Sequence, residues 1–432
     1  MNIREVVFGE FFKRHPKAMM KYVLEPLHRA RRRIAPRRAV LFCGQSYYHA
    51  WYLSRELRKL GWRADVLNWD LNPAAQIYYH GQDFHFADEK YQSVEAQLDF
   101  FFEAIDKYDI FHFSNMGGLS FGFRLSTYFK ENFWEHFEID LLRALGKKIV
   151  YSNTGCMDGV SQTSFSKWGP ISPCASCNWR NHPEVCSDES NLAWARFRNS
   201  VADYQCNIGG NRADYNDDPR VHEAPGFYCL DQDFWRPDLE IPEAYRLQSR
   251  PGAVRLYHVI GNKDARTDKE GTNIKSSHIY VPLIERFKAE GHDVEHLSYH
   301  HVPNKEIRFY QAQADIVLDM LTFGFFGANG REALMLGKPL VCFLRPEWLE
   351  SMRAEFPEYV DELPVVQANP GNVYQVVKRL IENRDEREEI GRRSRAFAVK
   401  WHSSHAGARH FDRVYEGLLR GRRLLRKEPT NG

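Results

Sequence analysis

Residues 314–344 read ADIVLDMLTFGFFGANGREALMLGKPLVCFL, and this stretch decides the fold. It starts and ends with apolar runs of strand character, 314–321 and 338–344. Between them, a glycine-rich loop leads into a short apolar helix over 331–337 that ends at a glycine. A strand that returns to a second strand through a helix forms a βαβ unit, in which the two strands are parallel. The stretch therefore predicts a parallel sheet covered by helices.

The same alternation of strand and helix patterns extends over two blocks of the chain. The first block has strand patterns at 39–44, 63–70, 108–113 and 147–153 and a helix pattern at 140–146. The second block adds strand patterns at 254–261, 292–300 and 364–368 and a helix pattern at 276–291. Since 432 residues exceed what one hydrophobic core usually supports, we expect an α/β protein with two doubly wound, Rossmann-like domains that face a cleft.

A polar, proline-bearing stretch at 236–252 would serve as the linker between these domains. The expected divisions are a basic amphipathic segment at 1–38, an N-terminal Rossmann-like domain at 39–235 with a cysteine-rich insertion at 156–190, the linker, a C-terminal Rossmann-like domain at 253–400 and a basic C-terminal helix at 401–432 that returns to the N-terminal domain. Binding residues are expected at the carboxyl ends of the strands, in the cleft.

Basic charge is concentrated at the N-terminus. Residues 1–38 hold 11 Lys and Arg against 3 Asp and Glu, although the net charge of the whole chain is +2. An apolar helical face formed by Met20, Val23, Leu24 and Leu27 is flanked by the cations Lys17, Lys21, Arg31, Arg32 and Arg33. Such a helix suits an anionic membrane surface. The alternative is a helix packed on the body of the protein with a solvated basic side.

The location of the protein follows from segments that the sequence does not contain. No apolar run approaches the roughly 18 residues that span a bilayer, and the N-terminus has no apolar core and cleavage site of the signal-peptide kind. We therefore expect a cytoplasmic protein that is peripherally associated with the inner face of the membrane.

The glycine-rich loop has the composition of an anion site. Gly327 and Gly330 stand at the start of the expected helix, where free backbone N–H groups hold phosphate oxygens. Glu332, early in that helix, is placed to accept two hydrogen bonds from a vicinal diol such as a ribose. The alternative is a first-turn Glu that only favours the helix dipole.

The loop resembles the donor site of GT-B glycosyltransferases, in particular the retaining family 4 group. That group carries an E-x7-E motif, in which the second Glu holds the nucleotide ribose and the first contacts the donor sugar. The resemblance assigns the second role to Glu332, but the first position is Gly324 here. We expect Gly324 to leave that space open, so that the sugar is oriented by loop amides or by Asn329.

A second resemblance lies in HVIGNKDARTDKEGT, residues 258–272. Family members carry an Arg and a Lys in the loop after the first strand of the C-terminal domain, and these cations bind the donor diphosphate. Arg266 and Lys269 match that pattern, and Lys275 is the substitute if the register shifts. Fixed cations of this kind stabilise a leaving diphosphate, so the resemblance implies catalysis without a metal. The alternative is a solvated charged loop.

In the N-terminal domain, YDIFHFSNMGG and GKKIVYSNTGCMDG resemble segments on the acceptor side in this group. They make His112 a candidate catalytic or acceptor-binding residue, with Asn153, Thr154 and Gly155 beside it and Asp158 as a weaker candidate. Gly44, with Gln45 and Ser46, resembles the glycine loop that approaches donor phosphates in related enzymes. A single His at a strand end is often structural, and this alternative stays open.

The insertion contains PCASCNWRNHPEVC, residues 173–186. Cys174, Cys177 and Cys186 have metal-ligand spacing, and Cys156 or His182 could complete a set of four. A closed site of this kind would hold structural zinc and pin an irregular insertion. An iron–sulfur cluster or free thiols are the alternatives. The surroundings carry no basic patch, so we expect no nucleic-acid partner.

These features together predict a glycosyltransferase that moves a sugar from a nucleotide-sugar donor to a glycan or lipid-linked acceptor in cell-envelope polysaccharide synthesis. The resemblance implies retention of anomeric configuration. Two other functions remain open. One is a nucleotide-sugar 2-epimerase, which uses the same fold. The other is a non-catalytic binding subunit on a degenerate GT-B fold, motivated by Gly324 in place of an acid.

Overall fold

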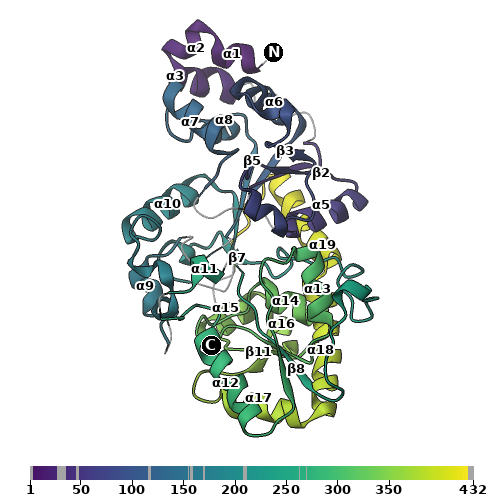
Figure 1. Ribbon diagram of the computed structural model, residues 1–432. Helices are drawn as coiled ribbons and strands as arrows, with labels where there is room; N and C mark the ends of the chain where they lie inside the picture. The colour runs from purple at the N-terminus through teal and green to yellow at the C-terminus, as the bar shows by residue number, and fades with distance from the viewer. Residues whose placement is uncertain are drawn as a thin grey trace.

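The computed structural model describes residues 3–26, 36–44, 48–114, 118–153, 155, 159–168, 171–207, 212–261, 263–268 and 270–426. They form two α/β domains joined through 236–252, where one short 3₁₀ turn occurs, η7 (Glu243–Tyr245). The two-domain, Rossmann-like architecture predicted from the sequence is confirmed (Figure 1).

The N-terminal domain is built on a seven-stranded sheet in the order β3-β2-β1-β4-β5-β6-β7, with every pair parallel. Its strands are β1 (Ala39–Cys43), β2 (Arg63–Asn68), β3 (Phe84–His85), β4 (Ile110–Phe113), β5 (Lys148–Ser152), β6 (Tyr204–Asn207) and β7 (Val221–Glu223). Its helices are α5 (His49–Lys59), α6 (Val94–Lys107), α7 (Phe123–Asn132), α8 (Phe137–Ala144), α9 (Gln162–Ser166) and α10 (Asp188–Val201). The central strands are apolar and fully buried because helices cover both faces of a parallel sheet.

The C-terminal domain has a five-stranded parallel sheet in the order β12-β11-β10-β8-β9. Its strands are β8 (Val254–Tyr257), β9 (Val294–Leu297), β10 (Ile316–Leu318), β11 (Leu340–Cys342) and β12 (Val366–Gln367). Its helices are α11 (Lys263–Arg266), α12 (Ser277–Ala289), α13 (Asn304–Ala312), α14 (Ala328–Met335), α15 (Pro346–Glu355), α16 (Pro357–Glu362) and α17 (Val373–Glu382). The strand order reverses between β8 and β10, and ligands bind at such a switch point in open α/β sheets.

Two long helices close the chain, α18 (Arg384–His402) and α19 (Ser404–Leu419). They are separated at Ser403, which caps α19 and pairs with Leu230 in an isolated bridge. From there α19 runs along α5, where Asp412 accepts hydrogen bonds from Arg38 and from Trp62 Nε1 (Figure 1). The C-terminal helix therefore returns to the N-terminal domain.

Short helices at the N-terminus pack onto the N-terminal domain: α1 (Ile3–Phe8), α2 (Glu10–Arg14), α3 (Pro16–Met19) and the π-helix η1 (Met20–Leu24). The rings of Phe8 and Phe12 contact those of Phe102 and Phe137, with centroids 5.8 and 6.2 Å apart. Met20 and Leu24, expected on a membrane-facing side, are buried in the same hydrophobic cluster, whereas Leu27 and Arg31–Arg33 lie outside the described residues. These two apolar side chains are thus covered by the protein's own core.

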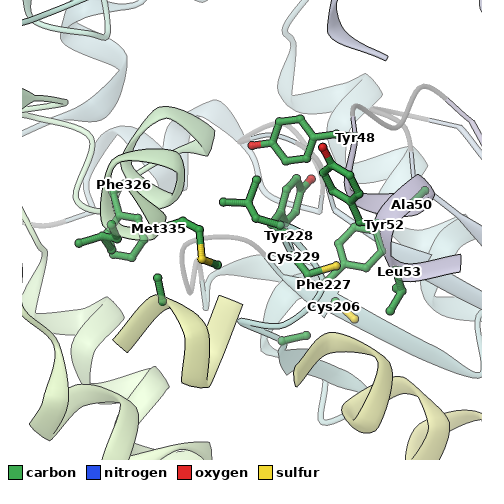
Figure 2. Close-up of a cluster of buried hydrophobic side chains, with 14 of the residues drawn as sticks. Tyr48, Ala50, Tyr52, Leu53, Cys206, Phe227, Tyr228, Cys229, Phe326 and Met335 are labelled. Carbon is green, nitrogen blue, oxygen red and sulfur yellow. The ribbon is translucent and has the colours of Figure 1, made fainter. Parts of the chain in front are cut away.

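A single hydrophobic cluster crosses from one domain to the other. Figure 2 shows Tyr48, Tyr52 and Phe227 of the N-terminal domain gathered with Phe326 and Met335 of the C-terminal domain. Because buried aromatic side chains dominate this contact, the two domains are joined by a packed interface as well as by the linker and α18–α19.

Candidate functional site

A cavity of about 440 Å³ lies between the two domains. Its C-terminal-domain wall is formed by residues that follow β8, β9 and β10, and β8 and β10 are the two strands at the switch point. Its roof comes from the cysteine-rich insertion, which contributes Cys174, Trp179 and Arg180. The cavity therefore occupies the place where the sequence predicted a ligand.

The N-terminus of α14 opens into this cavity. Gly327 is its N-cap, and the Gly327 N–H donates to Asp319 Oδ2 at 3.3 Å. Lys275 Nζ donates to the other oxygen of Asp319 at 2.6 Å. The remaining N–H groups of the first helical turn have no acceptor within the helix, so this end of α14 provides an anion site next to the Lys275–Asp319 ion pair.

Arg266 lies at the end of α11 and also lines the cavity, with an exposed side chain. Lys269, its predicted partner, lies outside the described residues. Lys275, the predicted substitute for Lys269, has only 12% of its side chain exposed and lies directly beside Gly327. Of the described cations in this loop, Arg266 and Lys275 are therefore the two placed to meet a diphosphate.

Glu332 lines the cavity, but its carboxylate is already bound by three donors. Oε1 accepts from Tyr48 Oη at 2.9 Å and from Asn304 Nδ2 at 3.1 Å, and Oε2 accepts from Gln311 Nε2 at 2.8 Å. Burial raises the pKa of Glu332 above its ordinary value, although the three hydrogen bonds and the nearby Lys275 oppose that effect. Tyr48 belongs to the N-terminal domain, so this carboxylate also bridges the two domains.

Gly324 does not leave open space. Its φ is +104°, and a Cβ there would lie 2.7 Å from Arg345 Nε and 2.8 Å from Arg345 Cβ. Arg345 is completely buried, and its Nη2 donates to Phe323 O at 3.2 Å. The expectation of an empty pocket at the missing acid is therefore wrong, because the Arg345 side chain fills it.

The remaining loop residues have different roles. Asn329 lines the cavity and accepts from Gln311 Nε2 at 2.7 Å, and its own Nδ2 has no partner among the described residues. Gly330 is buried instead, and a Cβ there would lie 2.7 Å from Phe326 Cβ. Gly330 thus serves close packing of α14 and does not contact the cavity.

Gly44 directly follows β1 and has a φ of +130°, a backbone conformation that favours glycine. It does not line the cavity. Gln45 and Ser46 lie outside the described residues, so the contact of this loop with donor phosphates stays a prediction.

The structure places His112 in the core of the N-terminal domain and not in the cavity, where the sequence predicted it. It is fully buried, its Nδ1 is hydrogen-bonded to Tyr415 Oη and its Nε2 to Ser152 Oγ, both at 2.6 Å. Burial lowers the pKa of His112 well below its usual range. Its ring stacks on Phe227, away from the cavity, because β4 presents this side chain to the core beneath α19.

Of the other acceptor-side candidates, Gly155 lines the cavity and Asn153 is buried, where its backbone oxygen accepts from Tyr228 Oη at 3.2 Å. Thr154 and Asp158 lie outside the described residues.

Cys174, Cys177 and Cys186 all line the roof of the cavity. Burial raises the pKa of Cys174 to about 12, and the two other thiols add to this effect. His182 faces elsewhere: it is exposed, and its Nδ1 pairs with Glu184 at 2.9 Å. In the described part of the chain no three His, Cys, Asp or Glu side chains are placed to hold a metal ion, and Cys156 lies outside that part. A zinc site completed by Cys156 stays a prediction, which elemental analysis of the purified protein tests.

Sequence reasoning missed four residues of the site: Tyr48, Asn304, Gln311 and Arg331. Tyr48 is 284 positions away from Glu332 in the chain, so no local pattern could connect them. Arg331 adjoins Glu332 and was readable as a cation beside the expected acid.

Comparisons with known proteins bear on the fold. No protein-family model matches the sequence, and no curated protein matches it. Among solved structures, HepE of Anabaena in complex with UDP and glucose matches with a TM-score of 0.52 at 13% identity, covering 87% of this chain and 99% of that one. Sucrose-phosphate synthase from Thermosynechococcus elongatus matches with a TM-score of 0.51 at 10% identity, covering 89% and 99%. These similarities, together with the two facing Rossmann-like domains, show that the chain has the GT-B fold.

Proposed function

We propose that the protein is a glycosyltransferase that takes a sugar from a nucleoside-diphosphate sugar bound in the interdomain cavity. The observation that carries this proposal is the meeting of the α14 N-terminus, Lys275, Arg266 and Glu332 at the switch point of the second sheet. The helix terminus and the two cations suit a diphosphate, and the carboxylate suits a ribose. The UDP and UDP-glucose complexes of HepE, which has the same fold, support this type of ligand.

The finer assignment follows the resemblance to the retaining family 4 group. We propose retention of configuration without a catalytic metal, with Arg266 and Lys275 stabilising the charge that develops on the leaving diphosphate. The acceptor would be a glycan or a lipid-linked glycan in cell-envelope polysaccharide synthesis.

A thermal-shift screen of nucleoside diphosphates and their sugars tests the function. A ligand that binds only the folded protein stabilises it, by about 2.7 kcal/mol at a concentration 100 times its Kd. Arg266→Ala should weaken the best ligand about tenfold, the effect of losing one charge-assisted contact of about 1.4 kcal/mol. Lys263→Ala is the matched control, because Lys263 lies on the same helix but not in the cavity. Equal affinities in all three proteins, or no binding by the wild type, would contradict the proposal.

Turnover experiments separate the other two functions. An epimerase converts UDP-N-acetylglucosamine with no acceptor present, whereas a transferase needs one. A binding subunit would retain the nucleotide sugar and turn over nothing.

For the membrane partner we propose the exposed basic side of α2, α3 and η1, which carries Lys13, Lys17 and Lys21 beside Tyr22, itself 69% exposed. Among the described residues no helix is both long and apolar enough to cross a bilayer. Reversing the three lysines to glutamate should abolish binding to vesicles containing anionic lipid, since each basic residue near such a surface contributes about 1 kcal/mol. Truncation is a poorer test because Met20 and Leu24 are core residues. Unchanged vesicle binding would refute the membrane proposal.

A further inference from the structure

Arg331 is a buried cation inside the cavity. It lies in the first turns of α14, and only 8% of its surface is exposed, yet it lines the cavity with Tyr48 and Tyr228. Within the described residues no carboxylate forms an ion pair with it, and its Nε has no hydrogen-bond partner. A guanidinium in this state has lost hydration without gaining a counter-charge.

The groups around Arg331 do not compensate its charge. Its guanidinium carbon lies 5.0 Å from the ring centre of Tyr228 and 5.5 Å from that of Phe326. Burial, and after it the charge of Arg331, lowers the pKa values of His49 and His402 to about 3, so both are neutral near pH 7. Cation–π contacts contribute about 2 kcal/mol or somewhat more in desolvated sites, less than the several kcal/mol that desolvating an ion costs.

The single carboxylate of the cavity does not serve Arg331 either. Among the described lining residues the charged side chains are four cations and one acid: Arg180, Arg266, Lys275, Arg331 and Glu332. Glu332 is committed to Tyr48, Asn304 and Gln311. The cation therefore lacks an anion that a ligand can provide.

The position of Arg331 indicates which part of a ligand it meets. The groups that suit a diphosphate, at the α14 N-terminus, Lys275 and Arg266, all come from the C-terminal domain. Arg331 follows Gly327 by four residues, one turn along the same face of the helix, and its ring neighbour Tyr228 belongs to the N-terminal domain. Arg331 therefore lies on the side of the cavity that borders the N-terminal domain, where the proposed function would bring the transferred sugar and the acceptor together.

We propose that Arg331 binds a second anionic group beyond the diphosphate, namely a carboxylate carried by the transferred sugar or by the acceptor. The rings of Tyr228 and Phe326 stand beside the guanidinium but offer it no acceptor oxygen of a carboxylate, and a planar guanidinium suits a planar, bidentate partner, the geometry that carboxylates provide. The inference rests on the proposed function, since it assigns a substrate class to the same cavity.

Titrations of wild type and Arg331→Gln test this inference, with UDP, UDP-glucose and UDP-glucuronic acid as probes. A carboxylate on the donor sugar should make UDP-glucuronic acid bind the wild type at least tenfold tighter than UDP-glucose, and the substitution should remove that preference. A carboxylate on the acceptor should instead make free glucuronate, followed by ligand-observed NMR, bind the wild type better than glucose does, and bind Arg331→Gln no better. UDP itself should change less than threefold between the two proteins.

Two results would overturn the inference. One is a loss of UDP affinity as large as that of UDP-glucuronic acid, which would assign Arg331 to the diphosphate. The other is the absence of any carboxylate preference in both arms. If the wild type binds no UDP compound, the proposed donor fails for uridine nucleotides, while the glucuronate arm still tests Arg331 on its own.

Thermal unfolding without ligand excludes a purely structural role. Removing a buried cation that has no counter-charge should leave the Tm of Arg331→Gln equal to or above that of the wild type. Arg331→Lys keeps the charge but not the bidentate fork, and should retain part of the carboxylate preference. A lower Tm in Arg331→Gln with no change in any ligand preference would show that the residue only supports packing.

Discussion

Replacing Glu332 by alanine should abolish measurable nucleotide-sugar binding and lower the free energy of unfolding by about 3 kcal/mol or more. Tyr48 Oη, which is buried, and Asn304 Nδ2, which is partly buried, would lose their acceptor, and Gln311 Nε2 would keep only Asn329 Oδ1. Each unsatisfied buried donor costs about 1–3 kcal/mol. Calorimetric titration measures the binding, and denaturant unfolding measures the stability.

Two further substitutions separate binding from folding at this position. Glu332→Gln keeps the shape and one acceptor oxygen, so it should unfold within about 1 kcal/mol of the wild type but bind the nucleotide sugar about 100-fold more weakly. Tyr48→Phe is the matched control. A carboxylate has about four acceptor sites and three are occupied, so a ribose diol must displace one donor. Removing the Tyr48 hydroxyl should therefore preserve or tighten binding. Full affinity for the nucleotide sugar in Glu332→Gln would show that the Glu332 carboxylate does not bind it.

The protonation of Glu332 makes both the folding stability and the nucleotide affinity depend on pH, in opposite directions. Its folded-state pKa lies above the ordinary 4.5, mainly through burial. Between 4.5 and the raised pKa the folded protein binds more protons at this group than the unfolded chain does, so this group favours folding more as the pH falls. Nucleotide affinity should change in the opposite direction, since the protonated form loses acceptor capacity. Glu332→Gln should lose both dependences.

Restoring the missing acid by Gly324→Glu should not create a sugar-contacting carboxylate, and it should destabilise the protein by about 3 kcal/mol. The positive φ of Gly324 costs a non-glycine residue about 1–2 kcal/mol, and displacing buried Arg345 adds an overpacking cost of about 1–3 kcal/mol. Equilibrium unfolding in urea measures the total.

A pair of alanine variants separates the backbone contribution to this destabilisation from the contribution of the contact with Arg345. Gly291 has a φ of +86° and nothing within 4 Å of a Cβ, so Gly291→Ala reports the backbone contribution alone. Gly324→Ala reports the backbone contribution and the contact with Arg345 together. If the two variants unfold alike, or if Gly324→Glu raises the affinity for a nucleotide sugar, then Arg345 does not hold the loop in the conformation described.

The apolar strands were predictable because each carries its own signal. The runs that became β1, β4, β5, β8 and β10 are short, apolar and followed by glycine or polar residues, as buried parallel strands require. The strand β6 was missed because its sequence, YQCN, is mostly polar. It is buried all the same, since Gln205 and Asn207 lie in the interior of the sheet, and only tertiary packing decides that outcome.

The residues of the candidate site likewise include some that the sequence could predict and some that it could not. The local sequence pattern identified four residues that the fold brings to one cavity: Gly327, Glu332, Arg266 and Lys275. The partners of Glu332 come from α13 and from the start of α5, which no local pattern connects to it. His112 was misread because a histidine near the end of a buried strand has the same sequence context whether it faces a cleft or a core. Its neighbours Tyr415 and Phe227 come from distant segments of the chain, and their contacts show that His112 faces the core.

Amide hydrogen exchange with and without a saturating nucleotide sugar tests whether the interdomain cavity is the donor site. The probe is the compound that gives the largest thermal shift. We expect protection at 259–261, at the end of α11 and at 323–332, the segments that line the cavity after β8 and β10. The same experiment on Glu332→Gln should show little protection at equal ligand concentration. Protection confined to other parts of the chain, or none at a ligand concentration that saturates binding, would contradict the account.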